Sequence, residues 1–157
     1  MNAEAIKELF GQLKLSHGVV KKLIEKFPDD KLDWKPANET RTVKEIITHF
    51  YGSGNGFVHA IQTGSLTEEE NRNFEKTDAA NVNELLKFCD AAFNSVYNLA
   101  ITLTDDELVK KIKMFYGEFP TSQLLQFFFT EFYHHYGQLT VYARLLDIIP
   151  PLAYDFE

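Results

Sequence analysis

Apolar side chains recur at helical spacing in several long segments of the chain. Three or four positions separate consecutive apolar residues, which is typical of helices that bury one face. The pattern predicts four main helices, near residues 3–27, 43–63, 82–103 and 121–148. We therefore expect a single all-α domain over residues 1–157, a four-helix bundle with long connections and without a sheet of three or more strands.

Residues that cap helix N-termini stand before these segments. Thr42 and Glu45 have the spacing of a capping box, in which each side chain bonds the other residue's backbone N–H. Asn81 and Glu84 repeat the pattern before the third segment, and Thr121 can cap the last one. These caps place the helix starts more firmly than the apolar pattern alone does.

The glycine-rich stretch 52–56 lies in the middle of the second predicted helix. Each glycine weakens a helix by about 1 kcal/mol relative to alanine. Two interpretations follow: the helix kinks or breaks there, or the small residues leave room beside His49 for a ligand or a neighbouring helix. Among the connections, we expect the acidic segment 63–80 to be the most mobile, with parts of it in short helix. We expect 111–120 to be a long irregular link that is partly extended.

Composition narrows the classes of function. The net charge is −7 and no Lys/Arg cluster stands out, which argues against nucleic acid as a partner. No apolar stretch approaches the roughly 20 residues that span a bilayer, and the N-terminus lacks the pattern of a signal peptide. We expect a soluble cytoplasmic protein without a membrane partner. Cys89 is the only cysteine and falls on an apolar stripe, so we expect a small core residue.

Glu131 and His135 conflict with their surroundings in the last predicted helix. They are four residues apart, so they share one face, and that face nearly coincides with the apolar stripe. A carboxylate and an imidazole directed into a core are costly unless they are paired or bound to metal. Gln138 and Tyr142 follow on the same side, whereas His134 points toward the edge. Such pairs usually only bond each other, and a metal site needs a third ligand from elsewhere.

Two further histidines lie on or beside apolar stripes. His17 falls in the middle of the first stripe, where a histidine is more often a satisfied core or pocket-wall residue than a ligand. We retain it as a candidate outer residue of a site. His49 lies at the border of the second stripe, from which its side chain can reach an internal cavity.

The order of several short motifs resembles the DinB/YfiT-like superfamily, over nearly the whole chain. The resemblance implies a four-helix bundle with a divalent metal in its core, held by one histidine of the second helix and two of the last, spaced His-x-x-x-His. The motifs are Leu32-Asp33-Trp34-Lys35-Pro36, Arg41 to His49, His134-His135-Tyr136-Gly137-Gln138-Leu139, Arg144-Leu145-Leu146 and Ile149-Pro150-Pro151.

Carried over residue by residue, His49 matches the first of these ligands and His135 the last, while Glu131 stands in the remaining position. A carboxylate still ligates Zn, Ni, Fe or Mn, and two histidines with one carboxylate form a known open site. The change favours harder metals. In the other interpretation the metal is lost, and Glu131 hydrogen-bonds His135 or His17 instead.

The resemblance also implies a function. Related proteins include metal-dependent transferases that use a low-molecular-weight thiol such as bacillithiol or mycothiol, and a metal can equally activate water for hydrolysis of a small-molecule substrate. Gln138, Tyr142 and His17 would be pocket or outer residues, and no residue identifies the catalytic groups or the substrate. The alternative is a non-catalytic, stress-associated bundle without metal that binds an apolar ligand or forms a homodimer.

Overall fold

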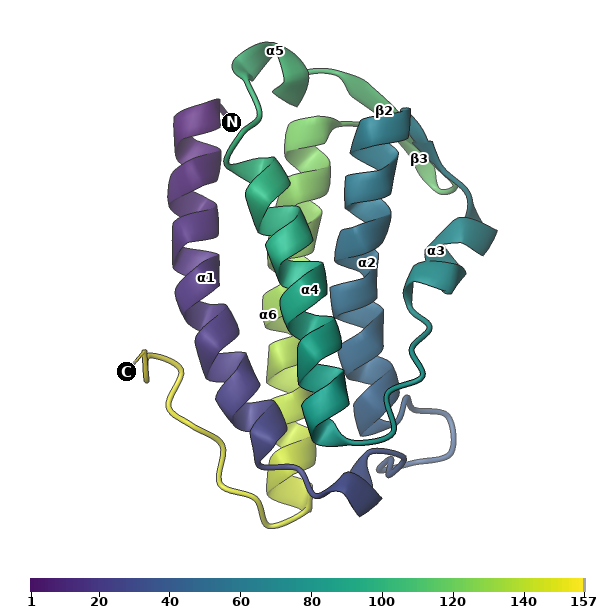
Figure 1. Ribbon diagram of the computed structural model, residues 1–157, viewed down its shortest axis with the longest axis vertical. Helices are drawn as coiled ribbons and strands as arrows, with labels where there is room; N and C mark the ends of the chain where they lie inside the picture. The colour runs from purple at the N-terminus through teal and green to yellow at the C-terminus, as the bar shows by residue number, and fades with distance from the viewer. Residues whose placement is uncertain (157) are drawn as a thin grey trace.

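Four long helices run side by side in the computed structural model, which describes residues 1–156 (Figure 1). α2 packs against both α4 and α6, and α1 covers the other side of that pair. This arrangement confirms the predicted all-α four-helix bundle. The helices are α1 (Ala3–Glu25), α2 (Val43–Thr63), α4 (Val82–Ala100) and α6 (Thr121–Leu145).

The connections contain more regular structure than the sequence indicated. Strands β1 and β2 pair in parallel, and β2 and β3 pair antiparallel, in a small sheet of order β1-β2-β3. The expectation of no three-stranded sheet was therefore wrong, and the link 111–120 is a β-hairpin. The short elements are η1 (Asp29–Lys31), β1 (Ser65–Leu66), α3 (Glu68–Phe74), α5 (Asp105–Leu108), β2 (Lys111–Met114) and β3 (Gly117–Pro120).

The hairpin forms because residues 111–114 alternate between solvent and core. Ile112 and Met114 are buried, while Lys111 and Lys113 face water, which is the period-two pattern of a half-buried strand. Gly117 begins the return strand with a φ of 150°, a conformation that favours glycine. A pattern of only four residues is too short to be distinguished from an irregular link by sequence.

The predicted caps were correct in part. Thr42 and Glu45 form a complete capping box at the start of α2. Asn81 accepts a hydrogen bond from the Glu84 N–H, but the Glu84 carboxylate accepts from Ala80 N–H, so only half of that box is present.

The prediction that Thr121 caps the last helix was wrong. Pro120 occupies the N-cap position and makes no side-chain cap bond. Thr121 is already helical and buried, and its hydroxyl donates to the Lys110 carbonyl at 3.2 Å. The helix start is instead joined to the residue that precedes β2.

The glycines of α2 allow a neighbouring helix to pack closely, and α2 stays helical throughout. A Cβ atom on Gly52 would lie 2.5 Å from the Phe74 carbonyl oxygen and 2.8 Å from Glu75 Cα. One turn later, a Cβ atom on Gly56 would lie 3.0 Å from Asn71 Oδ1. The second interpretation of the glycines is therefore correct: they admit α3, which lies beside α2 (Figure 1).

The core between the helices is built from large rings, as the composition indicated. Phe10, Phe50, Phe93, Phe128 and Phe132 are almost fully buried and form a chain of ring contacts. Cys89 is a free, buried thiol, as expected. Within residues 1–156, each helix is too short or too polar to cross a bilayer.

Candidate metal centre

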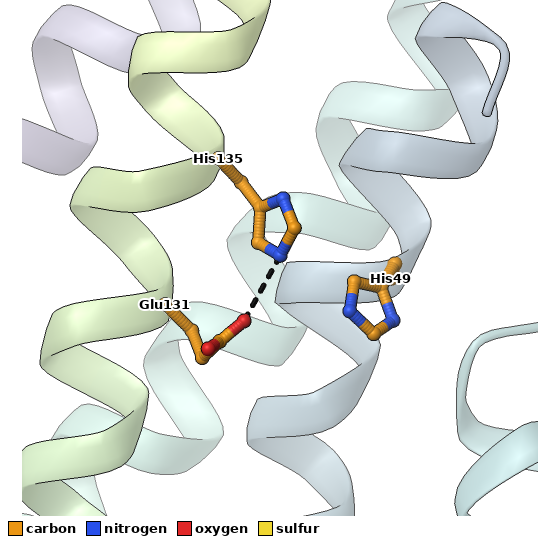
Figure 2. A group of neighbouring side chains, drawn as sticks. All are labelled: His49, Glu131 and His135. Atoms are coloured by element: carbon orange, nitrogen blue, oxygen red, sulfur yellow. Dashed lines mark hydrogen bonds and ion pairs between the residues drawn. The ribbon is translucent and has the colours of Figure 1, made fainter. Parts of the chain in front are cut away.

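Three side chains from two helices converge beside the aromatic core. α2 contributes His49, and α6 contributes Glu131 and His135 from successive turns (Figure 2). One ligand atom from each lies within 4.8 Å of the other two. The imidazole rings of His49 and His135 meet edge to face, with centroids 4.9 Å apart. The structure thus brings together the three residues that were predicted as ligands.

His135 has an oxygen beside each of its ring nitrogens. Nε2 lies 3.0 Å from Glu131 Oε2, and Nδ1 lies 2.8 Å from Gln138 Oε1. Burial lowers the pKa of His135, although the hydrogen bond with Gln138 opposes this effect. A neutral imidazole carries one N–H and can donate to only one of the two oxygens. If Gln138 takes that bond, the Nε2 lone pair faces a carboxylate, an arrangement that a cation between them would stabilise.

His49 also has a nitrogen without a hydrogen-bond partner. Its Nδ1 is buried and lies 3.0 Å from Glu75 Oε1, but the two groups are not aligned for a hydrogen bond. Figure 2 shows one ring nitrogen of His49 turned toward Glu131 and His135 and the other turned away. A carboxylate behind the distal nitrogen is the usual outer partner of a metal-binding histidine. Glu75 is therefore placed to orient His49.

Sequence reasoning missed Glu75 because it lies in the acidic segment that was expected to be mobile. Asn71 fixes its carboxylate by donating to Oε1 at 3.0 Å. The available signal was the pair Gly52 and Gly56, four residues apart on the face of α2 that follows His49. Two such glycines leave room for a segment packed closely against the helix, and the segment after α2 is near in sequence.

An apolar cavity of about 280 Å³ opens onto two of the three side chains. His49 and Glu131 form part of its wall, and the Glu131 side chain is 44% exposed, so solvent and small molecules can reach the carboxylate. We call this the apolar cavity. The rest of its wall comes from α2, α3, α6 and the hairpin, namely Ser53, Phe57, Asn71, Phe115, Tyr116 and Phe127.

The donor set fits a divalent metal. Two imidazoles and one carboxylate suit Zn, Ni, Fe or Mn and leave coordination positions open for a substrate. A cation at this point would be held by the His49 ring nitrogen that faces Glu131 and His135, by the Glu131 carboxylate and by the lone pair of His135 Nε2. Glu131 hydrogen-bonds His135, and this bond is compatible with both sequence interpretations, a metal site and a pair without metal.

The two predicted outer residues on α6 lie at different distances from the centre. Gln138 contacts His135 directly, and its Nε2 also lies 3.1 Å from His134 Nε2. Tyr142 is one step further out, where its hydroxyl donates to the Arg41 carbonyl at 3.0 Å. Gln138 can orient a ligand, whereas Tyr142 supports a loop.

His17 belongs to a different cluster. Its Nδ1 lies 2.7 Å from the Tyr51 hydroxyl, its Nε2 lies 3.0 Å from Asp90 Oδ1, and its ring stacks on Phe93. These contacts join α1 to α2 and α4. Its hydrogen bonds do not reach the three candidate ligands, so the structure places His17 in the core, apart from the candidate site.

Comparison with known proteins agrees with this fold. The model of the DinB family matches residues 1–156. Protein YjoA of Bacillus subtilis (strain 168) is 29% identical over 134 residues, covering 83% of this chain and 84% of YjoA. Its crystal structure superposes with a TM-score of 0.75 and 22% identity, covering 93% of this chain and 96% of that chain.

A second B. subtilis structure is similar in fold. YfiT, described as a probable metal-dependent hydrolase with an unusual four-helix-bundle topology, superposes with a TM-score of 0.78 and 14% identity. The superposition covers 94% of this chain and 91% of YfiT. At this identity the likeness concerns the fold alone. The match of the family model over residues 1–156 is decisive: the chain belongs to the DinB family.

Proposed function

We propose that this protein is a divalent-metal-dependent hydrolase of a small molecule. The observation that carries the proposal is the convergence of His49, Glu131 and His135, two of which, His49 and Glu131, line the apolar cavity. A catalytic metal site needs ligands that leave positions open and a space where a substrate can meet the metal. The description of YfiT as a probable metal-dependent hydrolase supports the same reaction class.

The chain's own residues have separable roles in this proposal. When bound, a divalent cation supplies Lewis acidity toward water or a carbonyl oxygen. His135 stays neutral because burial lowers its pKa, so its nitrogen is available as a ligand near neutral pH. Gln138 and Glu75 hold the two imidazole rings from behind. Glu131, whose side chain is 44% exposed, supplies a negative charge to this set of ligands.

The apolar cavity sets the size of the group that approaches the centre. A volume of about 280 Å³ accommodates an aryl or short alkyl group but not a large ligand. Phe57, Phe115 and Phe127 in its wall exclude water around such a group. We therefore expect a substrate whose scissile bond is next to a small apolar part.

Metal analysis is the first test. Protein stripped with a chelator is titrated with Zn²⁺, Ni²⁺, Mn²⁺ and Fe²⁺, and metal content, melting temperature and hydrolysis of 4-nitrophenyl esters are measured. We expect one ion per chain, a higher melting temperature and hydrolysis that depends on the metal. His59→Ala is the matched control, because His59 is a partly exposed histidine of α2 paired with Glu70.

Two results would change the assignment. A protein that takes up no metal and shows no shift in melting temperature would support the alternative of a non-catalytic binding or dimerising bundle. Metal binding combined with consumption of a low-molecular-weight thiol, and without ester hydrolysis, would assign thiol transfer in place of hydrolysis. The homodimer remains a prediction for measurement by light scattering.

A further inference from the structure

Two polar hollows meet at Arg41, on the side of the candidate metal centre opposite the apolar cavity. One, of about 410 Å³, lies between the loop before α2 and residues Gln138 and Tyr142 of α6. The other, of about 460 Å³, extends from the same loop to Glu75 at the end of α3. Glu39, Thr40 and Arg41 line both. The hollows therefore reach Gln138 and Glu75, the outer partners of His135 and His49.

The candidate centre lies between these polar hollows and the apolar cavity. α6 runs opposite to α2 (Figure 1), and along it Phe127 lines the apolar cavity, Glu131 belongs to the centre and Gln138 lines a polar hollow. Glu131 and Gln138 are separated by seven residues, or about 10 Å along the helix. A molecule bound at the centre with two unlike ends would therefore have the apolar cavity on one side and the polar hollows on the other.

Arg41 is the cation of the polar hollows whose charged group is free to bind a ligand. Within residues 1–156, its guanidinium makes neither a hydrogen bond nor an ion pair. The chain carries a net charge of −7, so a free cation beside the candidate centre is an exception to the general surface. The other cations of the hollows are held by neighbours: Lys35 by the Asn38 carbonyl, Arg72 by Glu68, and Lys76 by Asn73.

The backbone holds Arg41 in place. Its carbonyl accepts the hydroxyl of Tyr142 at 3.0 Å, which ties the loop to α6. The next residue, Thr42, is the N-cap of α2, and Val43 N–H donates to the Trp34 carbonyl at 3.0 Å. A fixed backbone reduces the entropy that is lost when the side chain binds a ligand.

We infer that Arg41 binds an oxyanion of the substrate, a carboxylate or a phosphate, while the apolar part of the same molecule occupies the apolar cavity. This inference rests on the proposed function and names its substrate class: a small apolar acid with its scissile bond between the two ends. A guanidinium binds such an oxyanion through two parallel N–H donors. Glu39 lines the same hollows and weakens the attraction.

The test uses ω-phenylalkanoates of increasing length and the primary amides of the same acids. Binding is measured by calorimetry, first to metal-free protein and then to protein loaded with Zn²⁺. We expect the best carboxylate to bind about tenfold more tightly than its amide, because one charge-assisted pair is worth about one factor of ten or more. Arg41→Gln should abolish this preference and Arg41→Lys should keep part of it. The matching ω-phenylalkyl phosphates distinguish the two oxyanions.

Matched variants distinguish a specific effect of Arg41 on carboxylate binding from the effect of the general surface charge. Lys76→Gln removes a cation of the same hollow and should leave the preference unchanged, whereas Glu39→Gln should increase it. All three side chains are exposed, so the variants should melt at the wild-type temperature. An equal loss in Arg41→Gln and Lys76→Gln would overturn the inference in favour of a diffuse electrostatic effect.

The metal-free measurement distinguishes failure of this inference from failure of the proposed function. A carboxylate preference without metal that disappears in Arg41→Gln supports Arg41, whether or not Zn²⁺ binds. A preference that arises only with Zn²⁺ and survives Arg41→Gln assigns the carboxylate to the metal and overturns the inference. The absence of any preference in either form overturns it as well.

Discussion

The molecule contains two buried histidine clusters that differ in how their hydrogen bonds are satisfied. His17 lies between the hydroxyl of Tyr51 and the carboxylate of Asp90, so a neutral ring can accept from one and donate to the other. His135 lies between the carboxylate of Glu131 and the amide oxygen of Gln138, which are both acceptors. A neutral His17 ring can thus satisfy both of its partners, whereas a neutral His135 ring can donate to only one of its two.

The difference separates a structural histidine from a candidate ligand. Burial lowers the pKa of both His17 and His135, so burial and pKa alone do not distinguish them. The pairing of donors and acceptors does, because two acceptors around one neutral imidazole favour a cation beside that ring. The second cluster also lines the apolar cavity through His49 and Glu131, as a working site requires.

The largest expected effect is that one cluster loses metal affinity when its histidine is removed, whereas the other loses stability. His135→Ala should reduce metal affinity by more than about a hundredfold, since even outer partners of a ligand account for 10–100-fold. His17→Ala should leave metal affinity unchanged but lower the free energy of unfolding by about 2–4 kcal/mol, because it opens a cavity and leaves the Tyr51 hydroxyl unpaired. Metal titration and urea unfolding measure the two losses.

The control for this comparison is His134→Ala. His134 is exposed and contacts the candidate centre only through Gln138, so its loss should change metal affinity little. Equal losses of metal affinity in His134→Ala and His135→Ala would contradict the assignment of His135 as a ligand. A loss of metal in His17→Ala without a loss of stability would mean that the two clusters are not independent.

The second-largest expected effect is the loss of metal affinity when Glu131 is replaced. Glu131→Gln keeps the shape and removes the charge, so metal affinity should fall by at least about tenfold, while the metal-free protein should be as stable as the wild type or more stable. Glu131→His should retain metal, with a preference moved toward zinc. Metal content and melting temperature of the three proteins are the measurements. Unchanged metal content in Glu131→Gln would remove Glu131 from the ligand set.

The third effect tests whether α3 orients His49. Gly52→Ala would force α3 away from α2, because the new Cβ would lie within 3 Å of backbone atoms of Phe74 and Glu75. We expect Gly52→Ala to lose about 1–3 kcal/mol of stability. Its metal affinity should approach that of Glu75→Gln, which we expect to bind metal about tenfold more weakly than the wild type. Gly18→Ala, where nothing lies within 4 Å, should stabilise α1 by up to about 1 kcal/mol. Equal metal affinity in Gly52→Ala and Gly18→Ala would show that α3 has no part in the site.

The helices and the shared inward face of Glu131 and His135 were predictable from the sequence because both depend on periodicity. Apolar spacing placed α1, α2, α4 and α6, and the spacing of Glu131 and His135 placed both on one inward face. The third member, His49, came from the resemblance to the superfamily together with its position at the border of a stripe. Long helices repeat one signal over many residues, so single exceptions do not obscure it.

The outer parts of the site could not be predicted because they depend on contacts between distant segments. Glu75 reaches His49 only because α3 docks on two glycines, and Arg41 reaches the hollow only because Tyr142 fixes its loop. The hairpin 111–120 has too few residues for a clear alternation. His17, like His49, is a histidine on or beside an apolar stripe, and only the identity of its neighbours shows that its bonds are complete.

The smallest expected effect is the dependence of stability on pH. Burial lowers the pKa of His17, partly offset by Asp90, and burial likewise lowers the pKa of His135. The ordinary pKa of histidine is about 6.5, so below this pH the unfolded chain binds more protons than the folded chain. Stability should therefore decrease on acidification from pH 7 toward 5. Lys21 and Asp90 face His17, and His49, Glu131 and Gln138 face His135.

In metal-free protein, His17→Gln and His135→Gln should each flatten this dependence of stability on pH, measured by urea unfolding at several pH values. Added Zn²⁺ should steepen it in the wild type and in His17→Gln, because protons compete with metal for the ligands, but not in His135→Gln. A metal-induced steepening that persists in His135→Gln would place the metal at other residues.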